Sequence, residues 1–233
     1  MRHHQLNFEN SIWQKHLFSS LNYLNYNIHL FYYLWYGAPS HSNQWVHWNG
    51  GSHKPPEDVT SNFYSILGAY DSCDPNVLAK HMEWISQTGI GTIITSWWGK
   101  GRFEDKCVTQ IMDAANKHHI KVGWHIEPYG WRTGPSVASD VDYINQKYGS
   151  HPAYFHDPDH GNRGAFYVFQ SLKITDWSAI ENLKQHNIIL TQTTDQSKVA
   201  HFSGFYTYAV GHDPKTIDGW KGMNDYSKSY GLI

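Results

Sequence analysis

From residue 28 onward, apolar runs alternate with amphipathic stretches that carry helical spacing, and this alternation constrains the fold more than any other feature. Each strand-like run is followed by a helix-like stretch, in units of roughly 30 residues, which favours a parallel sheet covered by helices. The apolar runs predict strands at 28–36, 91–98, 121–127, 165–170, 187–193 and 204–210, and residues 231–233 resemble the start of a seventh. Helices are expected at 74–89, 104–118, 135–148, 176–186, 195–201 and 216–230.

Two architectures fit this pattern, a doubly wound sheet and a (β/α)8 barrel. No glycine-rich phosphate loop follows the first strand, which weakens the dinucleotide-binding form of the doubly wound sheet. Polar and aromatic side chains instead gather where the predicted strands end, and barrel enzymes build their sites there. The sequence therefore predicts an α/β fold, a (β/α)8 barrel, with about six strands and the start of a seventh present. Residues 1–27 are expected to lie outside the barrel, and residues 28–233 to form an incomplete barrel domain.

Charge and hydropathy exclude two classes of partner. The formal net charge is −2 and no Lys/Arg cluster is longer than two, so no nucleic-acid partner is expected. No run of 18 apolar residues occurs, so no membrane contact is expected from this chain itself. The first 27 residues also lack the apolar centre of a signal peptide. Cys73 and Cys107 show no spacing signature, and we expect both to be free thiols.

The sharpest local signal is the segment from His125 through Glu127 and Pro128 to Tyr129. In a strand, His125 and Glu127 point to the same face, and two ionisable side chains at a strand end are costly to bury without a partner or a task. A hydrogen-bonded structural pair is the plainer alternative, but position and the proline stop together favour function. The spacing also occurs in zinc deaminases, whose downstream P-C-x-x-C this chain lacks.

Aromatic residues crowd the predicted strand ends, in a chain with 11 Trp, 16 Tyr and 10 Phe. Trp97 and Trp98 are adjacent and so face opposite ways, which allows one to line a barrel mouth while the other packs under helices. An exposed aromatic face in a cleft suits the apolar face of a sugar ring. On spacing alone, the placement of both Trp residues in the core is an equal alternative. On the first strand Tyr36 is the best candidate for the mouth, because it is the last aromatic before the turn at Gly37.

Metal-dependent chemistry has weak support despite the 17 histidines. The segment 156–160 contains two His and two Asp, but a proline interrupts it and no regular spacing makes the side chains converge, so it predicts a solvated loop. No H-E-x-x-H, EF-hand loop or G-x-S-x-G elbow occurs. Neither a metal nor a cofactor is therefore expected.

Several segments together resemble glycoside hydrolase family 99, a family of endo-α-1,2-mannosidases. The resemblance covers about residues 27–233 and is carried by HLFYYLWYGAP (29–39), WVHWN (45–49), KPPEDVTSNFYSILGAYDSCDP (54–75), TSWWG (95–99), KVGWHIEPY (121–129), YGSHPAYF (148–155) and FYTYA (205–209). It implies a (β/α)8 barrel that cleaves internal α-1,2-mannosidic bonds of glucosylated N-glycans with retention of configuration and without a metal. The substrate's own 2-hydroxyl would attack the anomeric carbon with help from a carboxylate, while a second carboxylate acts as general acid. It also implies a Golgi-lumenal location, since full-length animal relatives are membrane-anchored there.

The resemblance assigns roles to particular residues of this chain. A mannose-containing N-glycan would be the substrate and partner, and Tyr36, Trp97, Glu127 and one of Tyr206 or Tyr208 would line its site. With His125 from the strand pattern, the predicted substrate-binding set is complete: Tyr36, Trp97, His125, Glu127, Tyr206 and Tyr208.

Two departures from the family pattern matter for activity. The family's catalytic glutamate pair lies in an Asn-Glu-Trp-His-Glu stretch that this chain does not contain, so the resemblance places the pair beyond residue 233. At 167–172 the sequence is Tyr-Val-Phe-Gln-Ser-Leu, where the family usually has Tyr-x-Tyr-Asp-Ser-Tyr. We therefore expect a C-terminally truncated copy whose 233 residues alone do not hydrolyse mannosides. An incomplete barrel leaves open sheet edges, so marginal stability or aggregation is also expected.

Two other hypotheses remain open from the sequence. A sugar-binding pseudoenzyme would keep the stacking aromatic residues without the acid pair. A different barrel hydrolase would use His125, Glu127 and the segment 156–160 with a metal.

Overall fold

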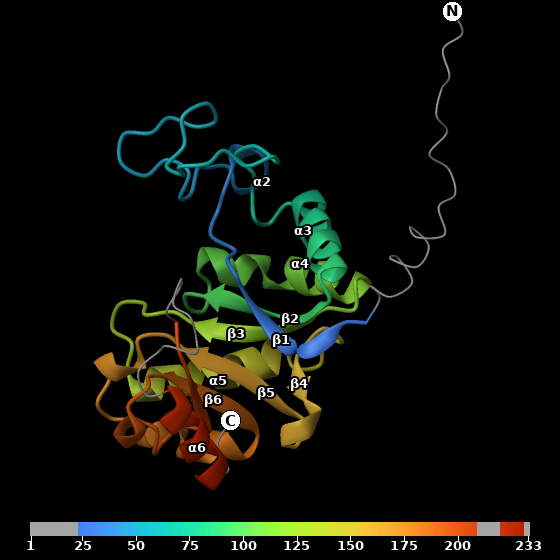
Figure 1. The fold of residues 1–233 in the computed structure, drawn as a ribbon. Helices are drawn as coiled ribbons and strands as arrows, with labels where there is room; N and C mark the ends of the chain where they lie inside the picture. The colour runs from blue at the N-terminus through green and yellow to red at the C-terminus, as the bar shows by residue number, and fades with distance from the viewer. Residues whose placement is uncertain (1–22, 209–219, 231–233) are drawn as a thin grey trace, which may run out of the picture.

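The computed structural model describes residues 23–208 and 220–230 and shows a curved, largely parallel sheet with helices along its outer side (Figure 1). Six parallel strands follow one another in chain order across the sheet, and β4 pairs antiparallel with β5 at one side. The strands are β1 (Asn25–Tyr32), β2 (Ile90–Trp97), β3 (Lys121–Ile126), β4 (His156–Asp157), β5 (Arg163–Val168), β6 (Asn187–Gln192) and β7 (Gly204–Tyr206). Parallel strands in sequential order with helical crossovers are the arrangement of a (β/α)8 barrel, so the predicted fold class is confirmed as a partial barrel.

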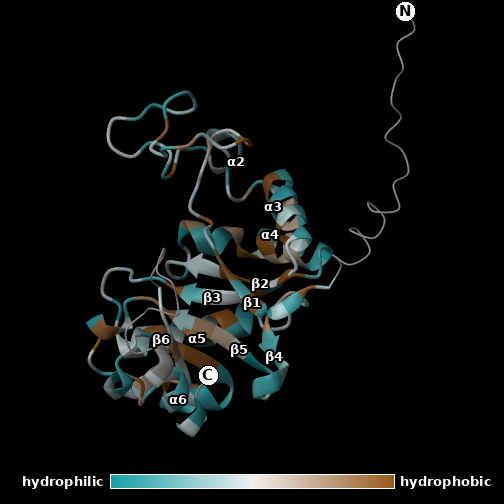
Figure 2. Cartoon of the chain, viewed as in Figure 1, coloured by the Kyte–Doolittle hydropathy of each residue, from teal (hydrophilic) through white to brown (hydrophobic). Residues whose placement is uncertain are grey.

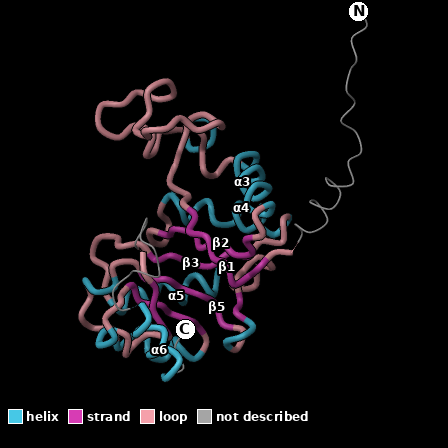
Figure 3. The backbone as a smooth tube through the Cα atoms, viewed as in Figure 1, coloured by secondary structure: helices cyan, strands magenta, loops and turns pink. Residues whose placement is uncertain are grey.

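Two of the main helices, α3 and α5, begin at capping residues. The side chain of Asp74 accepts a hydrogen bond from the backbone N–H of Asn76 at the start of α3, and Thr133 forms a capping box with Ser136 at the start of α5. The α-helices are α2 (Pro39–Ser42), α3 (Pro75–Gln87), α4 (Phe103–Lys117), α5 (Gly134–Tyr148) and α6 (Trp220–Tyr230). Short 3-10 turns are η1 (Pro158–His160), η2 (Ser171–Lys173), η3 (Ser178–Gln185) and η4 (Gln196–Lys198). A long segment, 43–74, is mainly loop and projects beyond the sheet (Figure 3).

Several predicted boundaries differ from the structure. The helices expected at 176–186 and 195–201 are instead the 3-10 helices η3 and η4. Asp195 caps η4, and Asp176 lies two residues before η3; the side chain of each accepts from the backbone N–H two residues on. β1 begins at Asn25 and ends at Tyr32, earlier than predicted at both ends. The final predicted strand, 231–233, and the end of the sixth, 209–210, lie outside the described residues.

The strand alternation gives the sheet two differently built faces. Residues on the outer face pack against the helices in the main hydrophobic core, which includes Ile93, Val122, Trp124, Ile126 and Phe166. On the inner face a smaller cluster contains Phe155, Ala165, Ile188, Leu190 and Tyr206. Hydrophobic residues accordingly run along the central strands and the helices that cover them (Figure 2). The helix-covered outer face therefore supplies most of the buried apolar surface that holds this part of the barrel together.

Cys73 and Cys107 form a disulfide, so the expectation of two free thiols was wrong. Cys73 lies just before α3 and Cys107 lies within α4, and these two helices pack beside each other on the outer face. Their Cα atoms are 5.1 Å apart, within the range that a disulfide spans. The sequence separation of 34 residues gave no sign of this proximity, because only the barrel's order of neighbouring helices creates it. Within residues 23–208 and 220–230, no helix is both long and apolar enough to span a membrane.

Candidate functional site

His125 lies at the centre of a buried hydrogen-bonded group on the inner face of the sheet. Its ring is 1% exposed, with Nδ1 3.1 Å from Glu127 Oε1 and Nε2 3.0 Å from the Tyr206 hydroxyl. The Ser96 hydroxyl donates to the same Glu127 oxygen at 2.8 Å, and the Trp35 indole N–H donates to Ser96 Oγ at 2.9 Å. The result is a continuous chain of polar contacts from the segment after β1 through the ends of β2 and β3 to β7, and we call it the His125 group: Trp35, Ser96, His125, Glu127 and Tyr206.

The tautomer of the His125 ring sets the direction of its two contacts, one with Glu127 Oε1 and the other with the Tyr206 hydroxyl. Burial raises the pKa of Tyr206, and the charge of Glu127 raises it further, so the phenol keeps its proton.

The end of β3 places Glu127 at the mouth of the partial barrel. Its backbone N–H donates to the carbonyl of Trp97, which continues the β2–β3 ladder by one residue, and Pro128 then ends the strand. Because alternate residues share a face, His125 and Glu127 both point inward. The prediction that these two side chains share a face is therefore confirmed, and they also form the hydrogen bond of the plainer alternative, at the carboxyl end of the parallel strands, where barrel sites are built.

Aromatic rings surround the His125 group on the inner face. The Tyr208 ring stacks on the His125 ring at 5.5 Å between centroids, and Phe31 and Phe169 lie 4.8 Å and 5.3 Å from it. Tyr167 stands beside Tyr206, with ring centroids 5.0 Å apart. These flat apolar faces beside carboxylate, imidazole and phenol groups form a surface that is suited to a ring carrying hydroxyl groups.

Tyr36 lies in a neighbouring aromatic group rather than among the contacts of His125. Its ring stacks on Trp48 with a centroid distance of 4.1 Å and meets Tyr70 edge-on at 5.6 Å. His47 stacks on Trp35, whose indole donates to Ser96, so the two groups adjoin through Trp35. Tyr36 therefore lies close to the mouth but one layer away from His125.

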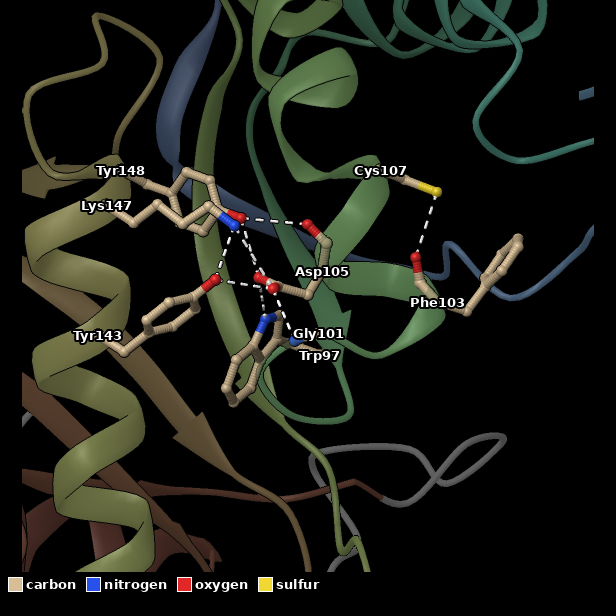
Figure 4. Close-up of polar contacts among 8 residues, drawn as sticks. All are labelled: Trp97, Gly101, Phe103, Asp105, Cys107, Tyr143, Lys147 and Tyr148. Atoms are coloured by element: carbon tan, nitrogen blue, oxygen red, sulfur yellow. Dashed lines mark hydrogen bonds and ion pairs between the residues drawn. The ribbon is translucent and has the colours of Figure 1, made fainter. Parts of the chain in front are cut away.

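Trp97 does not join the His125 group. Its ring is fully buried on the outer face, and its indole N–H donates to Asp105 Oδ1 at 3.1 Å (Figure 4). The strand alternation that directs Ser96 inward turns Trp97 outward under the helices. Its neighbour Trp98 faces the other way, is partly exposed and lies 6.3 Å from the ring of Trp35. Of the two alternatives that the sequence left open, Trp98 is the one beside the mouth.

Arg132 is a member of the site region that the sequence analysis missed. Its guanidinium donates to the backbone carbonyls of Ile126, Phe169 and Gln170, at 3.1, 2.6 and 3.2 Å. Burial lowers its pKa from the ordinary value of an arginine. These bonds join the ends of β3 and β5, and a single arginine in a loop gave no pattern by which to find it. Ser96 was also missed, although the inward register of β2 identifies it once strand pairing is known.

The segment 156–160 is largely exposed to solvent, as predicted, but it is not a loop throughout. His156 and Asp157 form β4 against β5, and the carboxylate of Asp157 holds the His160 ring at 2.8 Å. In the described part of the chain, no three His, Cys, Asp or Glu side chains gather in a way that could hold a metal ion.

Comparison with known proteins gives a consistent picture. The model of glycosyl hydrolase family 99 matches residues 23–233. A glycoprotein endo-alpha-1,2-mannosidase of Xenopus laevis is 35% identical over 225 residues, which are 79% of this chain and 50% of that protein. The Mus musculus protein of the same name is 36% identical over 181 residues, covering 66% of this chain and 39% of the mouse protein. The chain thus spans about half the length of the Xenopus relative.

A solved structure agrees with these sequence matches. The GH99 endo-alpha-mannosidase from Bacteroides thetaiotaomicron superposes with a TM-score of 0.77 at 27% identity, over 90% of this chain and 70% of that one. The six strands in sequential order, the inward-facing polar group at their carboxyl ends and the match over residues 23–233 all point the same way. The chain belongs to glycosyl hydrolase family 99, a family of glycosidases.

Proposed function

We propose that the inner face around His125 binds a mannose-containing N-glycan, and that the chain serves an endo-α-1,2-mannosidase that cleaves with retention. The observation that carries this proposal is the His125 group itself, a buried polar chain lined by aromatic rings at the carboxyl end of a partial barrel. The likeness to two vertebrate proteins named as endo-alpha-1,2-mannosidases supports the same substrate class.

Within this proposal the residues divide the work of binding. Of the two carboxylate oxygens of Glu127, Oε1 accepts the side-chain hydrogen bonds from Ser96 and His125. Within the described residues no side chain donates to Oε2, so this oxygen is left to accept from a sugar hydroxyl. The face of the Tyr208 ring that is turned away from His125 offers a platform for the apolar side of a sugar ring. Ser96 and His125 hold the Glu127 carboxylate in its orientation through their hydrogen bonds to Oε1, and Tyr206 in turn holds the His125 ring.

The proposed reaction needs two carboxylates that act on the substrate. One assists the attack of the substrate's 2-hydroxyl on the anomeric carbon, and the other protonates the leaving oxygen and later activates water. The family resemblance places this pair in a motif that residues 1–233 do not contain. The roles proposed for the residues described here are therefore substrate binding and orientation, not proton transfer.

The test measures binding and hydrolysis separately with the 233-residue chain. We expect calorimetric titration with α-1,2-mannobiose to show binding that Glu127→Gln or His125→Ala weakens at least tenfold. Asp113→Asn, at an exposed position on α4, is the matched control and should bind as the unaltered chain does. No binding by the unaltered chain would overturn the proposal. Hydrolysis that Glu127→Gln abolishes would instead make Glu127 catalytic.

We also propose that the protein works in an oxidising compartment, namely the Golgi lumen. The Cys73–Cys107 disulfide supports this, because disulfides persist in secretory compartments and are rare in reducing ones. Fluorescence microscopy of the tagged protein in cells tests this location, and a lack of co-localisation with Golgi markers would contradict it.

A second candidate is a carbohydrate-binding protein without catalysis. Gln170 favours it, because this residue stands where the family usually has an aspartate. Its backbone N–H donates to the side chain of Gln192, and its carbonyl accepts from Arg132. Release of reducing sugar from a glucosylated mannose oligosaccharide by the protein in its native source would decide between the two candidates.

A further inference from the structure

Trp131 is the most exposed large hydrophobic side chain of the described residues, and its backbone is strained. The side chain is 96% exposed, and φ is +67°, in the left-handed region. Bulky residues seldom adopt this conformation, because Cβ crowds the following carbonyl oxygen. Exposure on its own is common on protein surfaces, but exposure of an indole at a strained position is not.

The residues on both sides of Trp131 are firmly held. Arg132 is bound to the carbonyls at the ends of β3 and β5, and Thr133 caps α5. Before it, the Tyr129 hydroxyl donates to Asp140 and contacts Ser136, both on α5. A strained residue persists only where its surroundings enforce it, and these anchors do so. The indole therefore extends into solvent from a rigid base.

The position of Trp131 relates it to the candidate site. It follows Glu127 by four residues in the segment between β3 and α5, at the end of the sheet where β3 terminates (Figure 1). Four residues span at most about 14 Å, so the Cα atoms of Trp131 and Glu127 lie within that distance. A glycan of a few linked sugar rings is long enough to span such a distance.

We propose that Trp131 forms an outer sugar-binding subsite that stacks on a ring of the glycan outside the His125 group. The proposal rests on the proposed function, since it requires a carbohydrate in the inner site. A sugar presents a flat apolar face of C–H groups, and an exposed indole covers such a face without any need for polar partners. The proposal places this subsite beyond a disaccharide bound in the inner site, so the subsite would select for longer glycans.

The experiment compares two ligands and two variants by calorimetric titration of the 233-residue chain. The ligands are α-1,2-mannobiose and α-1,2-mannotetraose. Trp131→Gly removes the indole and places glycine where φ is positive, so we expect the melting temperature to stay the same or rise. Affinity for the tetraose should fall roughly three- to tenfold, a stacking interaction's usual worth, while affinity for the biose stays unchanged. The control Trp84→Ala replaces a partly exposed tryptophan on α3 and should leave the affinities for both ligands unchanged.

Each other result has a defined meaning. Binding of both ligands with no effect of Trp131→Gly overturns the subsite and leaves the proposed function standing. An equal loss for both ligands also overturns it, because Trp131 would then belong to the inner site. A lower melting temperature with weaker binding of both ligands would show a structural role and overturn it as well. If the unaltered chain binds neither ligand, the proposed function fails and the subsite fails with it.

Discussion

At the scale of single residues, Asp140 shows how burial and a nearby cation oppose each other. Its carboxylate lies half-buried on α5 and accepts from the Tyr129 hydroxyl, which fixes the segment that follows β3. Burial raises the pKa of Asp140 to about 6, although the Tyr129 hydrogen bond and the charge of Arg132 act in the opposite direction. The group is thus protonated in the folded protein over a range in which it is ionised in the unfolded chain.

This shift predicts a pH dependence of stability. Between about pH 4 and pH 6 the folded state binds more protons than the unfolded state, so the free energy of unfolding falls as pH rises. We expect Asp140→Asn to remove this fall. From pH 4 to pH 6 the free energy of unfolding of the variant should rise by about 1–2 kcal/mol relative to that of the unaltered protein, a figure that allows for solvent screening. Urea unfolding at several pH values measures it. A stability difference that is constant from pH 4 to pH 7 would contradict the assignment.

At the scale of elements, Asp105 joins β2, α4 and α5. Its carboxylate accepts from the Trp97 indole, the Gly101 N–H and the Tyr143 and Tyr148 hydroxyls, and Lys147 lies 3.5 Å away (Figure 4). These hydrogen bonds outweigh burial and lower the pKa of Asp105. The residue therefore stays ionised while it holds the two helices to the strand.

Replacing Asp105 with alanine leaves several buried donors without an acceptor. We expect a loss of about 3 kcal/mol in the free energy of unfolding, since each orphaned buried group carries a desolvation cost. Asp113→Ala on the same helix removes an exposed carboxylate and should change stability by less than about 0.5 kcal/mol. Thermal or urea unfolding of both variants measures the contrast. Equal stabilities would show that Asp105 is not what joins these elements.

The disulfide between Cys73 and Cys107 is a second connection between elements. It closes a loop of 34 residues, for which the chain-entropy relation gives about 4 kcal/mol of stabilisation. We expect reductant to lower the melting temperature of the protein and to leave a Cys73→Ser/Cys107→Ser variant unaffected. Thermal unfolding with and without reductant measures this. An unchanged melting temperature on reduction would contradict a stabilising disulfide.

The strands and main helices were predictable, whereas contacts across elements were not. Apolar runs of the right length identified β2, β3, β5 and β6, and Asp74 and Thr133 start helices by local chemistry alone. His125 and Glu127 were found because their relation is two residues along one strand. Spacing alone left open which of Trp97 and Trp98 faces inward, because adjacent strand residues give no indication of which face is inner; the family resemblance selected Trp97, whose ring lies on the outer face. The disulfide and Arg132 depend on which strands and helices become neighbours, which a single sequence does not state.

At the scale of the whole molecule, the described sheet is open. β1 and β7 lie at its two ends, and within the described residues each pairs with one neighbour only, β2 and β6 respectively. Unpaired strand edges offer backbone N–H and C=O groups to other chains. The inner face carries aromatic rings of the second hydrophobic cluster close to this open side.

The open sheet predicts self-association of the 233-residue polypeptide. We expect concentration-dependent oligomers in light scattering after size-exclusion chromatography, together with binding of a hydrophobic dye. A proline in place of Phe205 on β7 should reduce association, because proline cannot donate from a strand edge. A monomer at all concentrations, with a sharp melt and no dye binding, would contradict this prediction.

The two-faced sheet also gives the family a way to change specificity while keeping the fold. On β3, even-numbered positions (Val122, Trp124 and Ile126) belong to the helix-covered core, while odd-numbered His125 and Glu127 face the site. Substitutions that alter recognition and those that alter folding thus fall on alternate residues of one short segment. A saturation library across this strand should therefore separate by parity, with abundance in cells set by even positions and glycan recognition by odd ones.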